Sequence, residues 1–199
     1  MKRISLLFLF LLCACAAPTR TVTPQPAIAE PATFALNPTE PAELPTEANM
    51  PLQLTSDAFT NGQSIPAKYS CLGKNISPAL AWTEPPAGTQ TLALIVDDPD
   101  APGRTWTHWV LFNLPPDTRA LPEDYSAPEG SGILTGKNSS GMNRYEGPCP
   151  PSGTHRYYFR LYALDIAPSL APGATKAQLL KEMEGHILQQ AELMGTFSQ

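Results

Sequence analysis

QTLALIVDDPDAPGRTWTHWVLFNLP, residues 90–115, places two apolar runs on either side of a turn that contains two prolines. The first run, QTLALIVDD, is aliphatic and β-branched, which is typical of a strand buried on both faces. HWVLFNLP after the turn predicts a second strand. Asp98 and Asp100 straddle Pro99, and His108 begins the second strand. Because proline fixes φ, the turn should hold both carboxylates in place, and a hairpin would bring the imidazole back beside them.

The remaining pattern also favours strands. LQLTSDAF (52–59) and HRYYFRLYALD (155–165) alternate apolar and polar residues, and the connections between runs are rich in Gly, Pro and Asn. Only the tail is predicted to be helical, because Thr175 and Gln178 can form a capping box and Gly195 can end the helix. The apolar residues at helical spacing between them are Leu179, Leu180, Met183, Ile187, Ala191 and Met194. We therefore expect a mostly β (α+β) fold with antiparallel sheets and a C-terminal helix.

The chain begins with MKRISLLFLFLLCACAA (1–17), in which two basic residues precede an apolar run from Ile4 to Leu12. This arrangement is typical of a secretory signal, and the run is too short to span a bilayer. LCAC (12–15) resembles the lipobox of bacterial lipoproteins, which implies that residues 1–14 are removed and that Cys15 is lipidated. The alternative is ordinary signal cleavage near Ala14–Ala17.

A lipidated Cys15 would anchor the protein to a membrane of the bacterial cell envelope. Ala16 follows it in place of the aspartate that marks retention in the inner membrane, so we expect the outer membrane, facing the periplasm, where the cell has one. Residues 16–50 carry one Arg against four Glu and are dominated by Pro, Thr, Ala and Glu. Such a segment buries too little apolar surface to fold, so we expect residues 15–50 to form a disordered tether.

Residues 51–199 are long enough for a single domain with its own core. Ten Lys and Arg face fourteen Asp and Glu, a net charge of −4, without a basic stripe. Nucleic-acid binding is therefore not expected. Of the four cysteines, we expect Cys13 to leave with the signal and Cys15 to carry the lipid. Cys71 and Cys149 remain and can form a disulfide in an oxidising compartment, the alternative being two free thiols.

A second group of candidate residues lies in GPCPPSGTHRY, residues 147–157. Its prolines stiffen a loop, and Gly147 lets a ligand approach the backbone. His155 and Tyr157 are two residues apart, so on a strand both side chains face the same side.

DPDAP (98–102) followed by THWVLFNLP (107–115), and GPCPPSGTHRYYFRLYALD (147–165), resemble the phosphatidylethanolamine-binding protein family. The similarity is to its bacterial, Raf-kinase-inhibitor-like branch, and YSCLGKNISPALAW (69–82) and EGHILQQAELMGTF (184–197) extend it. The resemblance implies a larger and a smaller antiparallel sheet, helical elements including one at the C-terminus, and a small pocket for phosphate-like head groups. The resemblance implies these ligand-binding residues: Asp98, Asp100, His108, Pro150, Pro151, His155 and Tyr157. Gly147, from the loop described above, completes the set.

We expect Asp98 to orient a histidine from behind and Asp100 to fix the turn through local hydrogen bonds. A carboxylate beside an imidazole favours the charged imidazolium, so His108 or His155 could donate to a phosphate oxygen. Tyr157 would add a hydroxyl donor.

These residues favour a module that binds a small anionic ligand, without enzymatic activity, cofactor or metal. One alternative is a regulator of another envelope protein. A less favoured one is a His/Asp-dependent hydrolase, for which Ser139, Ser140 and Cys149 are candidate nucleophiles only because they lie near the loops. A zinc site built from Asp98, His108 and His155 is a further alternative.

Overall fold

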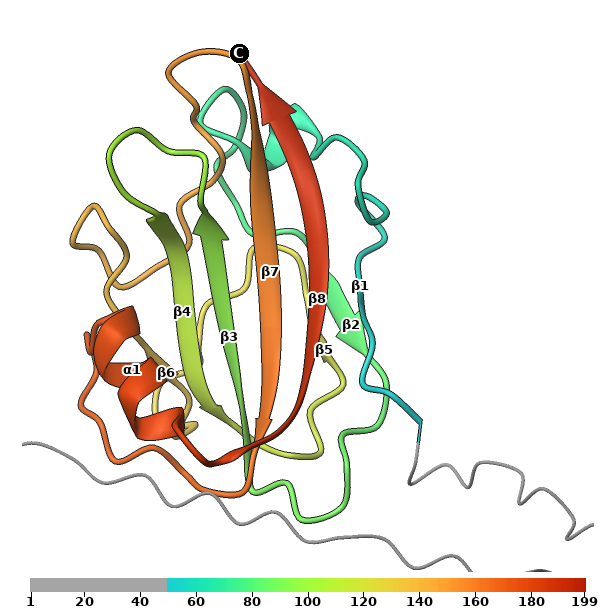
Figure 1. Cartoon of the computed structure of the whole chain (residues 1–199), viewed down its shortest axis with the longest axis vertical. Helices are drawn as coiled ribbons and strands as arrows, with labels where there is room; N and C mark the ends of the chain where they lie inside the picture. The colour runs from blue at the N-terminus through green and yellow to red at the C-terminus, as the bar shows by residue number, and fades with distance from the viewer. Residues whose placement is uncertain (1–49) are drawn as a thin grey trace, which may run out of the picture. The chain divides into compact units, whose positions relative to one another are not determined.

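The computed structural model describes residues 50–199, which form two antiparallel sheets (Figure 1). The larger sheet has five strands in the order β6-β4-β3-β7-β8, and the smaller has three in the order β1-β2-β5. A 3₁₀ turn, η2 (Ala67–Tyr69), and one helix, α1 (Lys176–Met183), complete the fold. The strands are β1 (Leu54–Thr55), β2 (Leu80–Trp82), β3 (Thr91–Asp98), β4 (Trp106–Leu114), β5 (Ala120–Leu121), β6 (Leu134–Thr135), β7 (Thr154–Leu164) and β8 (Ile187–Ser198).

Strands β3 and β4 of the larger sheet are buried on both faces, and each face has its own core. On one face, Leu94 and Val96 of β3 pack in the cluster that includes Leu80 of the smaller sheet. On the other, Ile95 of β3 packs in the cluster that includes Leu179 of α1. Figure 1 shows α1 in front of this second face. Because side chains alternate along a strand, a strand between two layers needs apolar residues on both of its sides, as β3 has from Leu92 to Val96.

Three of the four predicted strands are confirmed as β3, β4 and β7, with every residue of β3 buried. The segment 52–59 contributes only the two residues of β1 to a sheet. Buried and exposed side chains still alternate along this segment, because Leu52 and Leu54 are buried while Gln53 and Thr55 are exposed. The predicted mostly β fold with two antiparallel sheets is therefore confirmed.

The prediction that one helix runs through the tail to Gly195 is wrong. The capping box of Thr175 and Gln178 is present, but α1 ends at Met183, and Gly185 then takes a φ of 78°. Residues from Ile187 onward form β8, which pairs with β7 along nearly its whole length and is the true C-terminal element.

Two residues of this tail therefore have different surroundings from those predicted. Gly195 lies inside β8, where a Cβ would come within 2.5 Å of the Ile65 side chain and 2.8 Å of Phe59. A residue without a side chain thus lets the segment around Ile65 pack against the strand. His186, expected on the helix, lies between α1 and β8 with its Nδ1 2.8 Å from the Asp165 carboxylate.

The predicted disulfide between Cys71 and Cys149 is present, with an S–S distance of 2.08 Å. It joins the loop before β2 to the loop before β7. The predictions for residues 1–14, for lipidation at Cys15 and for the tether up to residue 49 lie outside the described residues. Between residues 50 and 199, no helix has the length and apolar character that crossing a membrane requires.

Candidate ligand-binding site

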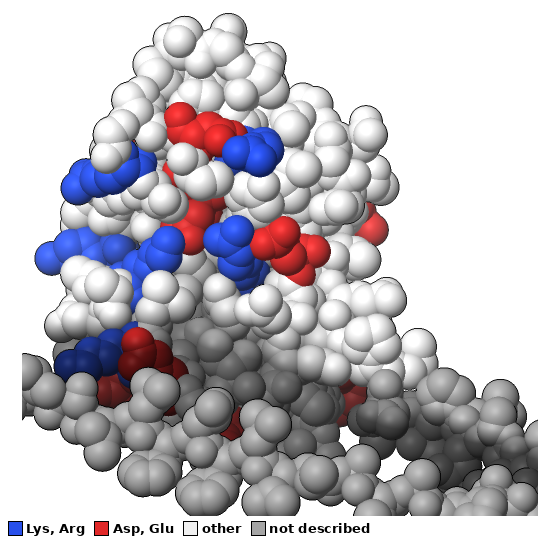
Figure 2. Space-filling view, in the orientation of Figure 1, with Lys and Arg blue, Asp and Glu red and all other residues white. Residues whose placement is uncertain are grey.

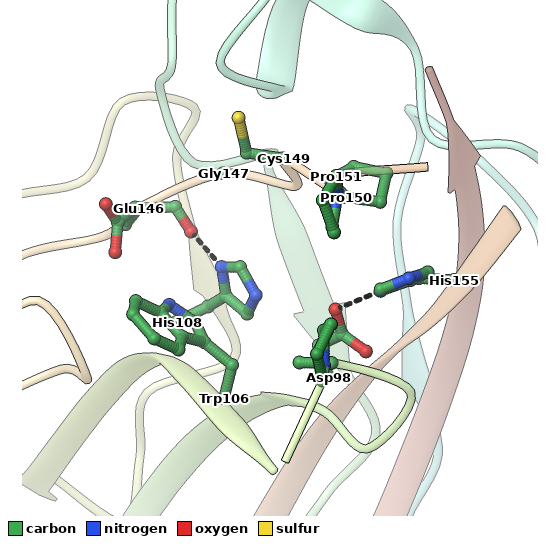
Figure 3. A pocket seen from close by; sticks show the side chains of 11 residues that line it. Asp98, Trp106, His108, Glu146, Gly147, Cys149, Pro150, Pro151 and His155 are labelled. Carbon is green, nitrogen blue, oxygen red and sulfur yellow. Dashed lines mark hydrogen bonds and ion pairs between the residues drawn. The ribbon is translucent and has the colours of Figure 1, made fainter. Parts of the chain in front are cut away.

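A cavity of about 230 Å³ lies where the end of β3, the start of β4, the loop before β7 and the start of β7 meet (Figure 3). Both sequence motifs that suggested a site contribute to its wall. The lining residues are Asp98, Ala101, Pro102, Trp106, His108, Glu146, Gly147, Cys149, Pro150, Pro151 and His155. Of the eight predicted ligand-binding residues, Asp100 and Tyr157 are the two that do not line it.

His108 is buried in the wall, with 4% of its surface exposed. Its Nδ1 lies 2.7 Å from the backbone carbonyl oxygen of Glu146. A carbonyl oxygen can only accept a hydrogen bond, so Nδ1 carries the hydrogen. The other ring nitrogen, Nε2, is buried and has no hydrogen-bond partner among residues 50–199.

Burial lowers the pKa of His108 below its usual value of 6.5, against the opposing effects of the Glu146 carbonyl and the Asp98 charge. The ring is therefore neutral at neutral pH, and Nε2 offers a lone pair rather than a proton. Of the two histidines that the sequence offered as a charged donor, His108 or His155, His108 is therefore the less suitable.

The second histidine is held by a carboxylate instead. His155 Nδ1 lies 2.7 Å from Asp98 Oδ2, and both side chains are buried. The other oxygen, Asp98 Oδ1, accepts the backbone N–H of Asp100 at 2.8 Å. The contact expected between Asp98 and a histidine is thus present, and the histidine is His155. Asp98 also makes the local hydrogen bond of the turn.

Asp100 is turned away from the cavity and pairs with Arg156. Its two oxygens lie 2.8 Å from Arg156 Nε and 2.6 Å from Nη2, and the backbone N–H of Arg156 donates to it at 3.0 Å. These hydrogen bonds hold the pKa of Asp100 at about 2. The local hydrogen bonds expected of Asp100 are replaced by a contact with β7, because the hairpin brings the turn beside that strand.

Tyr157 follows His155 on the same side of β7, as the spacing predicts, but lies behind the cavity wall and does not line the cavity. The centroids of the Tyr157 and His108 rings are 5.2 Å apart, and the rings meet edge-on. The Tyr157 hydroxyl is buried without a hydrogen-bond partner in the described part of the chain. Burial, reinforced by the Asp98 charge, raises the pKa of Tyr157, so the hydroxyl keeps its proton.

The loop with the two prolines is held against the segment around Tyr69. The Gly147 N–H donates to Asn75 Oδ1 at 2.7 Å, and a Cβ on Gly147 would lie 2.0 Å from the Tyr69 carbonyl oxygen. The disulfide from Cys149 to Cys71 adds a covalent link. Gly147 therefore allows the protein's own backbone to approach, which the sequence had suggested for a ligand.

No Lys or Arg side chain lines the cavity. The Glu146 carboxylate points away from it in Figure 3 and accepts the Ser140 hydroxyl at 2.6 Å, so Asp98 is the carboxylate that faces inward. Over residues 50–199, no group of three His, Cys, Asp or Glu side chains is placed to hold a metal ion.

The candidate nucleophiles are engaged elsewhere. The Ser139 hydroxyl accepts the backbone N–H of Thr107 at 2.8 Å, outside the cavity lining. The Ser140 hydroxyl donates to Glu146, and Cys149 is bonded to Cys71.

Five of the lining residues are not among the ligand-binding residues predicted from the sequence: Ala101, Pro102, Trp106, Glu146 and Cys149. A signal existed for Trp106, because it precedes His108 by two residues on β4 and so shares its face. No local signal marks Glu146, which acts through its backbone carbonyl, an atom that every residue has.

Comparison with known proteins places this arrangement in a family. The family model described as phosphatidylethanolamine-binding protein matches residues 55–198. The chain is 51% identical over 150 residues to a UPF0098 protein of Methanothermobacter thermautotrophicus, covering 73% of this chain and 98% of that protein. It is 48% identical over 153 residues to a UPF0098 protein of Chlamydia muridarum, covering 74% of this chain and 99% of the relative.

Two solved structures have a similar fold. One is a putative phosphatidylethanolamine-binding protein homolog from Chlamydia trachomatis, with a TM-score of 0.70, 45% identity, and coverage of 75% of this chain and 98% of that one. The other is E. coli YbcL, described as a new member of the mammalian family, with a TM-score of 0.70, 29% identity, and coverage of 75% and 99%.

Proposed function

The chain belongs to the phosphatidylethanolamine-binding protein family, and on this premise we propose that the cavity between β3, β4 and β7 binds a small anionic ligand without catalysing a reaction. The observation that carries the proposal is the pair of buried histidines in one wall, His108 and His155, each tied at Nδ1 to a fixed acceptor. With Nδ1 engaged, each ring has only Nε2 left for a ligand.

His155 is the donor in this proposal. Its Nε2 is the ring atom that would donate to an anionic oxygen of the ligand, and a hydrogen bond to a charged group is a strong one. The buried Asp98 fixes the ring orientation, so little rotamer entropy is lost on binding.

The size and stiffness of the cavity also favour a small group. A volume of about 230 Å³ is below the usual range for drug-sized ligands, so a phosphate or a head group fits and a whole lipid does not. Pro150 and Pro151 restrict the wall, and the disulfide at Cys149 holds its loop, so the site is formed before the ligand arrives.

The absence of catalysis is part of the proposal and is supported by the contacts of the candidate nucleophiles. Covalent catalysis needs a nucleophile within hydrogen-bond reach of a base. Ser139 and Ser140 make other hydrogen bonds, and Cys149 is in a disulfide.

Isothermal titration calorimetry of the full chain with inorganic phosphate tests the binding function. We expect binding in the wild type and a loss of tenfold or more in His155→Ala, since a charge-assisted hydrogen bond contributes roughly 1.5–3 kcal/mol. His186→Ala is the matched control, because His186 also pairs with a carboxylate but lies outside the cavity. Phosphate that does not bind, or binds equally well in His155→Ala, would contradict the proposal.

We also propose that lipid on Cys15 anchors this module in the cell envelope, on the strength of the lipobox-like LCAC alone. Mass spectrometry of the mature protein from its native host tests this. The proposal predicts an N-terminal Cys15 with a mass increase equal to acyl chains, and an unmodified N-terminus would exclude it.

A further inference from the structure

A groove of about 400 Å³ lies at the start of α1 and shares no lining residue with the cavity described above. We call it the basic groove, because three cations line it and no carboxylate does: Arg104, Lys137 and Lys176. They come from the turn before β4, from the segment after β6 and from the first residue of α1. Residues 51–199 carry a net charge of −4, so the positive charge is gathered locally.

The start of β4 separates this groove from the cavity. Trp106 and His108 line the cavity, whereas Thr105 and Thr107 line the basic groove. Because side chains alternate along a strand, residues two apart face one side and their neighbours face the other. The same stretch of chain therefore contributes to two distinct sites on opposite faces of the sheet.

Two of the three cations have no anionic partner in the part of the chain that the structure describes. Of the ten Lys and Arg residues between 50 and 199, five form an ion pair with an Asp or Glu of that range, and Arg104 and Lys137 are not among them. Both residues are exposed. Lys176 pairs with Asp97, which lies outside the groove lining and is shared with Arg160. An incoming anion therefore meets two cations that it can pair with directly.

Hydrogen bonds hold the segments of the groove together. The Lys137 N–H donates to the Ala174 carbonyl oxygen at 2.9 Å. The Thr107 N–H donates to the Ser139 hydroxyl at 2.8 Å, and the Ser139 N–H donates to the Thr107 carbonyl oxygen at 2.9 Å. Gly136 permits the close approach, because a Cβ there would lie 2.5 Å from the Ala174 carbonyl oxygen. The groove is thus formed before a ligand arrives, which lowers the entropy lost on binding.

The two unpaired cations suit phosphate oxygens. The Arg104 guanidinium lies over the Trp106 ring, 5.3 Å from its centroid, and this contact limits its freedom. The planar guanidinium can donate two parallel hydrogen bonds to one phosphate, while the Lys137 ammonium acts as a point charge. The exposed Thr105 adds a hydroxyl donor.

We propose that the basic groove is a second binding site, which takes a ligand with two phosphate groups, one held by Arg104 and the other by Lys137. The proposal is independent of the function proposed for the cavity. A volume of about 400 Å³ lies within the usual range for small-molecule sites and exceeds the 230 Å³ of the cavity, so there is room for more than one phosphate. Soluble diphosphates and lipid head groups with two phosphates share this chemistry.

Titration calorimetry of the full chain with inorganic pyrophosphate tests the site. We expect binding in the wild type and about tenfold weaker binding in the double variant Arg104→Gln/Lys137→Gln, because charge-assisted hydrogen bonds are lost. Lys74→Gln/Lys181→Gln is the matched control, since it removes the same charge from two exposed lysines outside the groove and should bind like the wild type. Pyrophosphate that does not bind, or that binds equally to both double variants, would overturn the proposal.

The variant His155→Ala separates the groove from the cavity. It should keep the pyrophosphate binding that Arg104→Gln/Lys137→Gln loses. Loss of that binding in His155→Ala would assign pyrophosphate to the cavity and overturn the proposal. Conversely, failure of inorganic phosphate to bind the cavity would remove the proposed function and leave the basic groove in place.

Vesicles distinguish a lipid source of the two phosphates from a soluble one. The full chain with Cys15→Ser, which cannot be acylated at that residue, is sedimented with phosphatidylcholine vesicles that do or do not contain cardiolipin, a lipid with two phosphates. Cardiolipin-dependent binding that Arg104→Gln/Lys137→Gln abolishes would assign the groove to a lipid head group. Pyrophosphate binding without cardiolipin-dependent binding would assign it to a soluble diphosphate.

Backbone amide NMR of the wild type locates the ligand without any variant. On addition of pyrophosphate, the amide signals of residues 104–107, 137–139 and 175–177 should shift. Shifts confined to residues 98–102 and 147–155, at the cavity, would overturn the proposal.

Discussion

Asp97 and Asp98 are consecutive residues of β3, both almost fully buried, yet they serve opposite faces of the sheet. Asp97, 1% exposed, meets α1: its oxygens lie 2.6 Å from Lys176 Nζ, 3.0 Å from the Thr107 hydroxyl and 3.5 Å from Arg160 Nη1. Asp98, 3% exposed, meets His155 at the cavity. Figure 2 shows the α1 face, on which acidic side chains lie beside Lys and Arg.

The difference lies in the partners. Ammonium and guanidinium groups stay charged over the physiological range. The negative charge of Asp97 is therefore always balanced by these cations, and the contact stabilises the fold. An imidazole changes its charge near neutral pH and has a second nitrogen for a ligand. A buried carboxylate therefore suggests a binding site when its partner is a histidine facing a cavity.

The largest expected effect is on the cavity side, from removing the disulfide. Replacing both Cys71 and Cys149 by Ser should lower the free energy of unfolding by roughly 2–5 kcal/mol, because the bridge closes a long loop in the unfolded chain. Hydrogen exchange should rise in residues 69–75 and 146–153, while α1 stays protected. An equal rise of hydrogen exchange in α1 would show that the two faces of the sheet are not independent.

The next effect separates the two carboxylates directly. Asp97→Asn leaves Lys176 and Arg160 without their shared carboxylate and should cost about 1–3 kcal/mol of stability with phosphate affinity nearly unchanged. Asp98→Asn should cost less stability but weaken phosphate binding about tenfold or more, because His155 loses its charged partner. Denaturant unfolding and calorimetry on both variants measure the two effects. If both variants lost the same phosphate affinity, Asp97 and Asp98 would not have the different roles assigned to them.

A smaller effect concerns the pH dependence of stability. The pKa of His108 is lowered in the folded protein, so as the pH falls below about 6.5 the unfolded chain takes up this proton first and the folded state is destabilised. The slope for one proton is at most about 1.4 kcal/mol per pH unit. The free energy of unfolding, measured with denaturant between pH 7 and pH 5, should depend less on pH in His108→Asn than in the wild type. The same flattening in a His186→Asn control would argue against His108 as the source.

The smallest effect is expected for Asp100, which touches neither core nor cavity. Asp100→Asn should lower stability by less than about 1 kcal/mol, since Arg156 is half exposed. Because the pKa of Asp100 is about 2, below the usual value of 3.8 for an aspartate, its contribution is present above pH 4 and is lost as the pH falls toward 2. Thermal unfolding at pH 6 and at pH 2.5 should show that the stability difference between the wild type and Asp100→Asn is smaller at pH 2.5. An undiminished difference at pH 2.5 would mean that the charge of Asp100 is not what stabilises.

Local patterns predict an element well when its residues satisfy themselves locally. The capping box of Thr175 and Gln178 is such a case, because its hydrogen bonds join residues three apart. The tail after Gly185 is not, because the hydrogen bonds that make Ile187–Ser198 a strand come from β7 along its length and, at Met194 and Thr196, from residues 62–65. Its apolar residues happen to continue the helical spacing, and only the left-handed glycine marks the true end.

The site divides in the same way. The period of two along β7, the stiff turn at Pro99 and the cysteine count led from the sequence to the His155 face, to the placement of Asp98 and to the disulfide. Tertiary structure decided that Asp98 holds His155 rather than His108, that Asp100 leaves the cavity for Arg156, and that a backbone carbonyl at Glu146 sets the tautomer of His108. The physical reason is that side-chain direction follows from the local backbone, whereas a hydrogen-bond partner and the loss of solvent depend on segments far away in the chain.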